Sequence, residues 1–471
     1  MTGFYDVKNF GAAGDGRTKD TAAIQSALDA CGRVGGGCVR LAQGVFVTGT
    51  LYLRTGVTLE IDGSAVLAAS PDIADYGTDT HHNRYRNEPE LDRCLIFAED
   101  VRNVTVCGHG TICGNAECFP NDGSIYRPMM FRFLRCEGIH LENLKLYDAA
   151  AWTTAFLDSR YIWARGLDIR NEKRFNGDGL DFDGCSHVYV SDCNIRGTDD
   201  NLCLQAGSRA YPTEDIHITN CSFSSVCAGI RIGLKSIGDI RNVVISNCTM
   251  REIWREGVKI ECSEGGRIED ILIQNMSMRN VRRPFFLILN NRYEPDGLGS
   301  SVELKEMPEI GVMDRIRIDG IHAVDDESMN QVHYRLGTDI MGRPEFAGVR
   351  VDAEENHPIR HLTIRDFYYR FVGGVTRERA YMGERMLWKG DPGPCDYPKV
   401  LDRLEFPSGE VSENYYPDWS RAAFMDIRNV NGLTMEGICL ESILPDGREE
   451  AVIENVTPDM NHLAAKTEII S

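Results

Sequence analysis

A repeat of about 27 residues is the feature that most constrains what this chain can fold into. Each copy contains a short run of alternating apolar and polar residues, which is typical of a β-strand. The central apolar residues follow one another at steps of 23, 26, 28, 27 and 28 positions, and they are Ile139, Ile162, Val188, Ile216, Val243 and Ile271. Self-similarity at this period predicts a solenoid, in which every coil packs on the coil before it.

A second column of residues supports the same register. Four turns carry Asp192, Asn220, Asn247 and Asn275 at steps of 28, 27 and 28 residues, and the next residues are Cys193, Cys221, Cys248 and Met276. We expect the asparagines to hydrogen-bond from coil to coil and the sulfur-containing side chains to fill the interior. A metal site in this column is disfavoured, because metal-binding cysteines usually come in closely spaced pairs. The two columns together predict an all-β fold, a single-stranded right-handed parallel β-helix.

The N-terminal region predicts one helix that caps this solenoid. Asp20 or Thr21 suits the N-cap position, and Ile24, Ala27 and Leu28 form an apolar stripe at helical spacing. A helix at this end would cover the core of the first coil and its unpaired strand edges.

The whole chain is expected to form one β-helix domain over residues 1–471. Its parts are the N-terminal cap and first coils at about 1–75, the regular coils with the candidate site at about 76–290, and later coils with long loops at about 291–471. Polar segments interrupt the repeat at 291–310, 323–356 and 372–420. Insertions in a solenoid form loops on one face, which is often the binding face.

Composition excludes several classes of partner. The formal net charge of −20 disfavours nucleic acid and anionic membranes, and an acidic substrate would need a locally basic cleft. No stretch approaches the 18 apolar residues of a membrane span. Residues 1–30 show no basic segment followed by an apolar run, and the 16 cysteines lack metal-like pairs. We therefore expect a cytoplasmic protein with reduced cysteines, or a secreted one if a leader has been removed. The oligomeric state cannot be predicted.

Three carboxylates in the regular coils are the candidate chemical site. Asp178 precedes the adjacent pair Asp199 and Asp200 by about one coil. Because neighbouring coils of a β-helix lie about 4.8 Å apart, the three side chains are expected to meet. Clustered carboxylates cannot all ionise independently, so one of them is expected to hold its proton near neutral pH. A protonated acid beside ionised bases is typical of glycoside hydrolysis. The alternative is that each aspartate only stabilises its own turn.

These residues lie in motifs that resemble glycoside hydrolase family 28, the polygalacturonase-like pectin hydrolases. The segment from Tyr5 to Gln25 is similar to the N-terminal cap of the family, and 110–114 is similar to its Gly-Thr-Ile-Asp-Gly turn. Residues 176–179, Asn-Gly-Asp-Gly, stand where the family has Asn-Thr-Asp-Gly, and Asp199-Asp200 stands where it has an Asp-Asp pair. The resemblance implies a right-handed parallel β-helix that hydrolyses pectic chains.

The resemblance also implies roles for individual residues. Asp199 would be the general acid, while Asp178 and Asp200 would activate the attacking water and so invert the anomeric carbon. The candidate substrate-binding residues are Asn176, Arg231, Lys259 and Tyr293. The sequence indicates no metal ligands and no cofactor.

Two motifs depart from the family pattern. The Gly-His-Gly of the family corresponds to Cys227-Ala228-Gly229, and its Arg-Ile-Lys, which binds a substrate carboxylate, corresponds to Lys259-Ile260-Glu261. A glutamate at this position would repel a galacturonate carboxylate. Nearby cations would either compensate for this change or be solvated surface charges, and they are Arg231, Lys235, Arg255, Arg282 and Arg283.

The function that we predict is an inverting glycoside hydrolase acting on pectin-derived oligosaccharides. Exo action on galacturonic-acid- or rhamnose-containing chains is expected, because long loops would close one end of the cleft. One alternative is a β-helix lyase or epimerase, which would use Lys259 or Arg231 to abstract a proton next to a carboxylate, often with Ca²⁺. The other alternative is a non-catalytic carbohydrate-binding β-helix.

Overall fold

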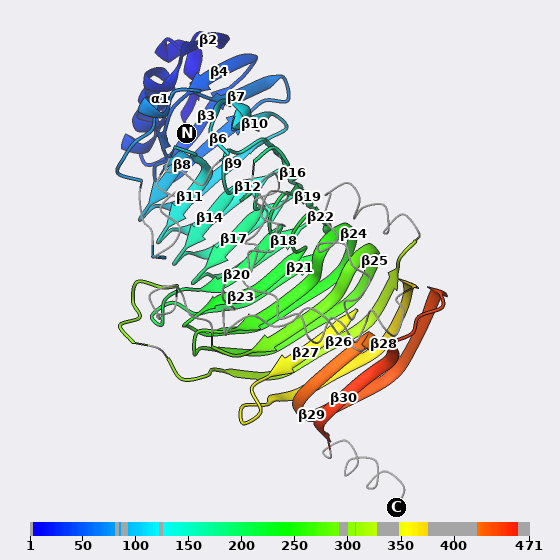
Figure 1. Cartoon of the computed structure of the whole chain (residues 1–471). Helices are drawn as coiled ribbons and strands as arrows, with labels where there is room; N and C mark the ends of the chain where they lie inside the picture. The colour runs from blue at the N-terminus through cyan, green and yellow to red at the C-terminus, as the bar shows by residue number, and fades with distance from the viewer. Residues whose placement is uncertain are drawn as a thin grey trace, which may run out of the picture.

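The chain forms an elongated parallel β-helix in the computed structural model (Figure 1). The structure describes residues 3–80, 84–85, 93–121, 126–174, 176–291, 300–306, 308–326, 348–374 and 422–459. Within these ranges the strands join in one continuous set of parallel pairings, wound as a right-handed helix. The predicted fold class is therefore confirmed. No helix in the described ranges is long and apolar enough to cross a membrane.

One face of the β-helix carries the candidate site, and we call it the site sheet. Its strands pair in the order β5, β8, β11, β14, β17, β20, β23 and then the end of β24. Their bounds are β5 Leu51–Tyr52, β8 Cys94–Glu99, β11 Met129–Leu134, β14 Thr154–Leu157, β17 Leu180–Asp183, β20 Leu202–Ala206, β23 Ile230–Ser236 and β24 Ile240–Cys262.

Two further faces complete each coil. The second face contains β1 Gly3–Asp6, β3 Gly37–Leu41, β6 Val57–Ile61, β9 Arg102–Gly108, β12 Glu137–Glu142, β15 Arg160–Arg165, β18 Ser186–Ser191 and β21 Thr213–Thr219. The third face contains β2 Asp15–Lys19, β4 Gly44–Thr48, β7 Ala65–Ala69, β10 Thr111–Cys113, β13 Lys145–Tyr147, β16 Asp168–Asn171, β19 Asn194–Gly197 and β22 Ser222–Ser225.

From β24 onward single strands bend around more than one face. β24 pairs with β21, β22 and β23 in turn, so it follows almost a whole coil. The later strands are β25 Arg267–Leu289, β26 Val312–Val324, β27 Val349–Ala353, β28 Ile359–Gly373, β29 Ala422–Leu444 and β30 Glu449–Pro458. The longer loops predicted at 291–310, 323–356 and 372–420 lie partly or almost wholly outside the described residues.

The register predicted from the repeat is confirmed in both columns. Ile139 pairs with Ile162, and the other anchors continue this row coil by coil. The turn residue Asn275 donates a side-chain hydrogen bond to Asn247 at 3.3 Å. Both have left-handed backbones, with φ of 54° and 56°, a conformation that asparagine tolerates better than most residues. The neighbouring residues Cys193, Cys221, Cys248 and Met276 are buried, as expected.

Alternation along the site-sheet strands decides which side chains face outward. Phe133, Phe156 and Phe182 stack inside on consecutive coils, with ring centroids 5.0 and 4.9 Å apart. Because successive residues of a strand point to opposite faces, Asp181 and Asp183 are directed outward. The hydrophobic core thus fixes the direction of the polar residues on either side of each phenylalanine.

The predicted helix is α1 Thr21–Arg33, and it lies at the N-terminal end of the solenoid (Figure 1). Ile24, Ala27 and Leu28 are buried against the first coils, as predicted. Asp20 is the N-cap, but its carboxylate accepts hydrogen bonds from the preceding loop at Ala13 and Gly14 and makes no cap bond. Three short 3-10 helices complete the described set, η1 Val7–Phe10, η2 Ile73–Asp75 and η4 Ala116–Cys118.

Candidate active site

The three predicted aspartates lie in the turns that lead into two adjacent strands of the site sheet. Asp178 precedes β17, and Asp199 and Asp200 precede β20. The turns are joined by their backbones, since Gly179 N donates to Asp200 O at 3.1 Å. The coil-to-coil stacking that the sequence predicted therefore brings these residues side by side.

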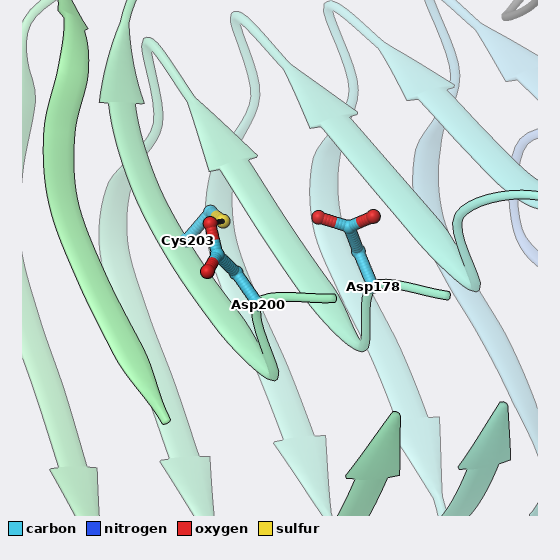
Figure 2. A group of neighbouring side chains, drawn as sticks. All are labelled: Asp178, Asp200 and Cys203. Atoms are coloured by element: carbon cyan, nitrogen blue, oxygen red, sulfur yellow. Dashed lines mark hydrogen bonds between the residues drawn. The ribbon is translucent and has the colours of Figure 1, made fainter. Parts of the chain in front are cut away.

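The carboxylates form one cluster around Asp200. A side-chain oxygen of Asp200 lies within 4.8 Å of one from Asp178, and the same limit holds between Asp200 and Asp199. All three residues are at most 4% exposed. Figure 2 shows Asp178 and Asp200 projecting from neighbouring turns on the same side of the sheet. The predicted meeting of the three side chains is confirmed.

Asp199 has the environment of a proton donor. Burial, together with the nearby charge of Asp200, raises the pKa of Asp199 to about 7, although Arg231 acts in the opposite direction. Its two oxygens are held separately: Asp200 N donates to Oδ1 at 2.9 Å, and Asn176 Nδ2 donates to Oδ2 at 3.4 Å. One carboxyl of the cluster thus keeps its proton near neutral pH, as the clustering predicted.

Asp200 is held by positive groups and N–H donors. Arg231 Nε lies 2.7 Å from Asp200 Oδ2, and both side chains are almost completely buried. Ala228 N donates to Asp200 Oδ1 at 3.1 Å. Ala228 stands where the resemblance expects a histidine, so this chain contacts the carboxylate there through a backbone N–H.

The spacing of the carboxylates bears on the stereochemical prediction. Inverting enzymes usually separate the acid and the base by about 6.5–9.5 Å, whereas Asp199 and Asp200 have oxygens within 4.8 Å. This pair alone does not provide the expected gap. The oxygens of Asp178 and Asp200 are close enough to be bridged by one water with two hydrogen bonds of about 2.8 Å. Asp178 and Asp200 together are therefore the candidate water-activating pair.

A row of outward-facing residues continues the site along the sheet. Asp181, Cys203, Arg231 and Lys259 are in register on consecutive strands. The Nη2 atom of Arg231 has no hydrogen-bond partner among the residues that the structure describes. A buried guanidinium N–H without a partner favours an additional acceptor, such as a substrate oxygen.

Lys259 is paired with the glutamate that departs from the family motif. Its Nζ lies 2.9 Å from Glu261 Oε2, and both side chains are at most 7% exposed. The sequence interpretation of Glu261 as a repulsive neighbour of the substrate is thus incomplete, because Glu261 also neutralises Lys259. Asn176 and Arg231 contact the cluster, and Lys259 lies one strand beyond Arg231 in the same row. Tyr293 lies outside the described residues.

Three of the neighbouring cations are buried, which overturns one interpretation from the sequence. Arg231, Lys235 and Arg283 are at most 4% exposed, so they are not solvated surface charges. Lys235 Nζ lies 3.6 Å from the ring centroid of Tyr85 and 5.2 Å from that of Trp152. Such cation–π contacts offset part of the cost of burying the charge. Arg255 is largely buried, with 12% of its side chain exposed, and Arg282 is half-buried.

The structure also assigns site residues that the sequence analysis missed. Arg84 bridges Asp158 and Asp183 at 2.6 and 3.2 Å, and Tyr85 donates to Asp183. Neither Arg84 nor Tyr85 belongs to a repeat or motif, so neither residue could be predicted from the sequence. Asp183 did have a signal in the sequence. It lies two residues after Asp181, and residues two apart on a strand face the same side of the sheet.

Asp178, Asp200 and Cys203 are close enough to hold a metal ion (Figure 2). Two features oppose this use. Burial, followed by the charges of Asp181 and Asp200, raises the pKa of Cys203 well above its usual range, so the thiol stays protonated. Arg231 already places a positive charge 2.7 Å from Asp200 Oδ2. The donor set therefore fits acid–base chemistry better than metal binding.

Comparisons with known proteins agree with this geometry. The profile of Glycosyl hydrolases family 28 matches residues 45–313. A probable polygalacturonase of Vitis vinifera is 29% identical over 263 residues, which are 50% of this chain and 52% of the relative. This chain spans about half the length of the curated relatives that it matches.

Solved structures show the same fold. The family 28 exopolygalacturonase of Yersinia enterocolitica has a TM-score of 0.68 at 16% identity, covering 97% of this chain and 78% of that one. The exopolygalacturonase of Thermotoga maritima has a TM-score of 0.65 at 21% identity, and the match covers 79% of this chain and 88% of that one. The family profile covers more than half of the sequence and includes all three aspartates, and this chain therefore belongs to glycosyl hydrolases family 28.

Proposed function

We propose that this protein is an inverting glycoside hydrolase that cleaves pectin-derived oligosaccharides. The observation that carries the proposal is the pKa of Asp199, raised to about 7 by burial and by Asp200, inside a cluster that also contains Asp178. A neutral acid beside carboxylates is the pairing that glycosidic cleavage needs. Membership of family 28 and the polygalacturonase names of its relatives support pectic chains as the substrate class.

In the proposed reaction Asp199 donates its proton to the glycosidic oxygen while the bond from that oxygen to the anomeric carbon breaks. A water held by Asp178 and Asp200 forms the new bond to the anomeric carbon and gives up a proton to one of these carboxylates. The products are two shorter saccharides, and the new reducing end has the opposite anomeric configuration.

The test uses the full chain and a panel of oligogalacturonides and rhamnogalacturonan oligosaccharides. We expect Asp199→Asn to lower kcat by about 10²- to 10⁴-fold, the usual contribution of a general acid. Asp192→Asn, at an exposed side chain in a turn of another face, is the matched control. Proton NMR of the first-formed anomer tests inversion. Unchanged turnover by Asp199→Asn would remove the proposed acid, and a first product of retained configuration would exclude the inverting route.

Exo action is part of the proposal, and contacts over the site sheet support it. Arg84 and Tyr85 cross from β14 to β20 by binding Asp158, Asp183 and Gln205. These contacts hold Arg84 and Tyr85 over the carboxyl ends of β14, β17 and β20, where they would limit how far a long chain extends over the site sheet. Two solved relatives in fold are exopolygalacturonases. We expect product analysis of a reducing-end-labelled hexamer to show stepwise shortening from the other end, and random internal cuts would contradict this.

A lyase reaction gives a different and easily measured product. Elimination would create an unsaturated uronate that absorbs in the ultraviolet, and chelation of Ca²⁺ would abolish it. Hydrolysis creates reducing ends without this absorbance. We expect reducing ends without absorbance, and the same rate with chelator.

A further inference from the structure

Arg127 is a buried cation that neither the family motifs nor the reaction described above uses. It lies two residues before β11 and is fully buried. Its Nη2 donates to Asn176 Oδ1 at 2.9 Å, and its Nη1 donates to Ala150 O at 3.3 Å. Asn176 in turn donates from Nδ2 to Asp199 Oδ2 at 3.4 Å. Arg127 therefore touches the residue that touches the proposed acid.

The chemistry of these groups allows only one orientation of the amide. Arginine has donors and no acceptor, so the oxygen of the Asn176 side chain must face Arg127. The NH₂ group of Asn176 must then face Asp199. Without Arg127 the amide could rotate by half a turn and present its oxygen to Asp199, which would be repulsive toward a carboxylate.

We propose that Arg127 is a positioning residue for Asp199: by holding the amide oxygen of Asn176, it keeps an N–H directed at the oxygen of the proposed acid. This inference rests on the proposed function. A donor at 3.4 Å is weak while Asp199 is protonated, and it strengthens when proton transfer to the glycosidic oxygen leaves a carboxylate. The pair Arg127 and Asn176 thus stabilises the product of proton transfer more than the starting state.

Other groups around Asp199 act on its charge independently of Arg127. The charged or titratable ones are Asp178, Asp181, Asp200, Arg231 and Cys227. All of them lie on β17, on β20 or β23, or in the turns before these strands, whereas Arg127 reaches the cluster from the turn before β11. A variant of Arg127 consequently changes the donor to Asp199 Oδ2 and leaves the other contacts in place.

The test compares the pH dependence of Arg127→Met with that of the unaltered chain. We expect the alkaline limb of kcat/KM to move up by about 0.5–1 pH unit, because the carboxylate form of Asp199 loses a donor. On a pectic oligosaccharide that the unaltered chain cleaves, kcat should fall about tenfold. On a nitrophenyl glycoside, whose leaving group needs little protonation, kcat should change much less. Arg127→Lys should restore part of both effects.

Two controls separate positioning from general destabilisation. Arg448→Met removes another buried arginine, which pairs with Asp446 in the last coils, and it should leave the pH profile unchanged. Asn176→Gly removes the amide but suits the left-handed φ of 51° at this position, and it should shift the alkaline limb in the same direction. An unshifted limb in Arg127→Met or in Asn176→Gly would overturn the inference. So would equal losses on both substrates.

A readout without turnover keeps this test separate from the proposed function. The carboxyl ¹³C shift of Asp199 can be titrated in the labelled protein, with Asp199→Asn for assignment. A higher pKa of Asp199 in Arg127→Met supports the positioning role even if no pectic substrate is cleaved. An unchanged pKa contradicts that role even if Asp199 is essential for hydrolysis.

Discussion

The behaviour of a single aspartate depends on what surrounds it, and Asp199 and Asp200 show this although they are adjacent in sequence. Asp200 faces the Arg231 guanidinium at 2.7 Å. Asp199 is buried beside the charge of Asp200, and these two causes raise its pKa to about 7. The sequence -Asp-Asp- gives no basis for this difference, because the burial of Asp199 and the contact of Arg231 with Asp200 come from the packing of the coils.

The pH profile follows from this difference. Asp199 must be protonated to act as an acid, so we expect kcat/KM to fall above about pH 7, by tenfold per unit, as its proton is lost. The measurement is kcat/KM on an oligogalacturonide between pH 4 and 9, at constant ionic strength. An alkaline limb below pH 5, where an ordinary aspartate titrates, would show that Asp199 is not the titrating acid.

At the scale of the strands and turns, residues at equivalent positions on successive coils form rows that run along the β-helix. The row on the site sheet sets Asp181, Cys203, Arg231 and Lys259 at successive heights. The turn row sets Asp192, Asn220, Asn247 and Asn275 in left-handed backbones. A residue in such a row is constrained by its neighbours above and below it as well as by its own strand.

Asn247 tests the turn row. Its Oδ1 accepts from Asn275, and its φ is 56°. We expect Asn247→Ala to lower the free energy of unfolding by about 1–2 kcal/mol, because alanine loses the hydrogen bond and is strained in the left-handed region. Asn247→Gly removes the strain and should cost less. Denaturant unfolding measures both variants, and an equal cost for the two would contradict the role of backbone strain.

Glu261 tests the row on the site sheet. Glu261→Gln removes the charge 2.9 Å from Lys259 Nζ, so we expect KM for an oligogalacturonide to fall about three- to tenfold, equivalent to about 1 kcal/mol. The matched control is Glu256→Gln, which removes a buried glutamate on the same strand that pairs with Arg283 of the next coil. A KM that improves equally for neutral rhamnose-ended substrates would argue against a uronate carboxylate at Lys259.

At the scale of the whole molecule, buried acids make stability depend on pH. Burial raises the pKa of Asp325 to about 7, although a hydrogen bond from Tyr369 lowers it. Burial likewise raises the pKa of Asp181 well above its usual range. In each case the folded state holds a proton that the unfolded state releases near pH 4. Each group therefore lowers the free energy of unfolding as the pH rises from about 4 to its folded pKa.

Asp325→Asn isolates one of these contributions. The variant cannot ionise, so at pH 8 it should be more stable than the unaltered chain by up to about 4 kcal/mol, with no gain near pH 4. Urea unfolding at the two pH values makes the comparison. A gain of equal size at both pH values would attribute the effect to packing instead of ionisation.

Much of the molecule follows from the sequence alone. The 27-residue repeat determines the coils, because alternating apolar residues can be buried only if each coil stacks on the next. The same stacking brings Asp178 to Asp199 and Asp200, so the aspartate cluster could be predicted from the sequence. The apolar stripe of α1 was enough to identify the cap.

Only the tertiary structure decides which charges are neutralised and which proton is retained. The contact of Arg231 with Asp200 and the path from Arg127 through Asn176 to Asp199 depend on distances between different coils. Periodicity places a residue in a row, but burial and electrostatic interactions depend on everything within a few ångströms of it. The sequence therefore determined where the acids meet, and the packing of neighbouring coils decided what each acid can do.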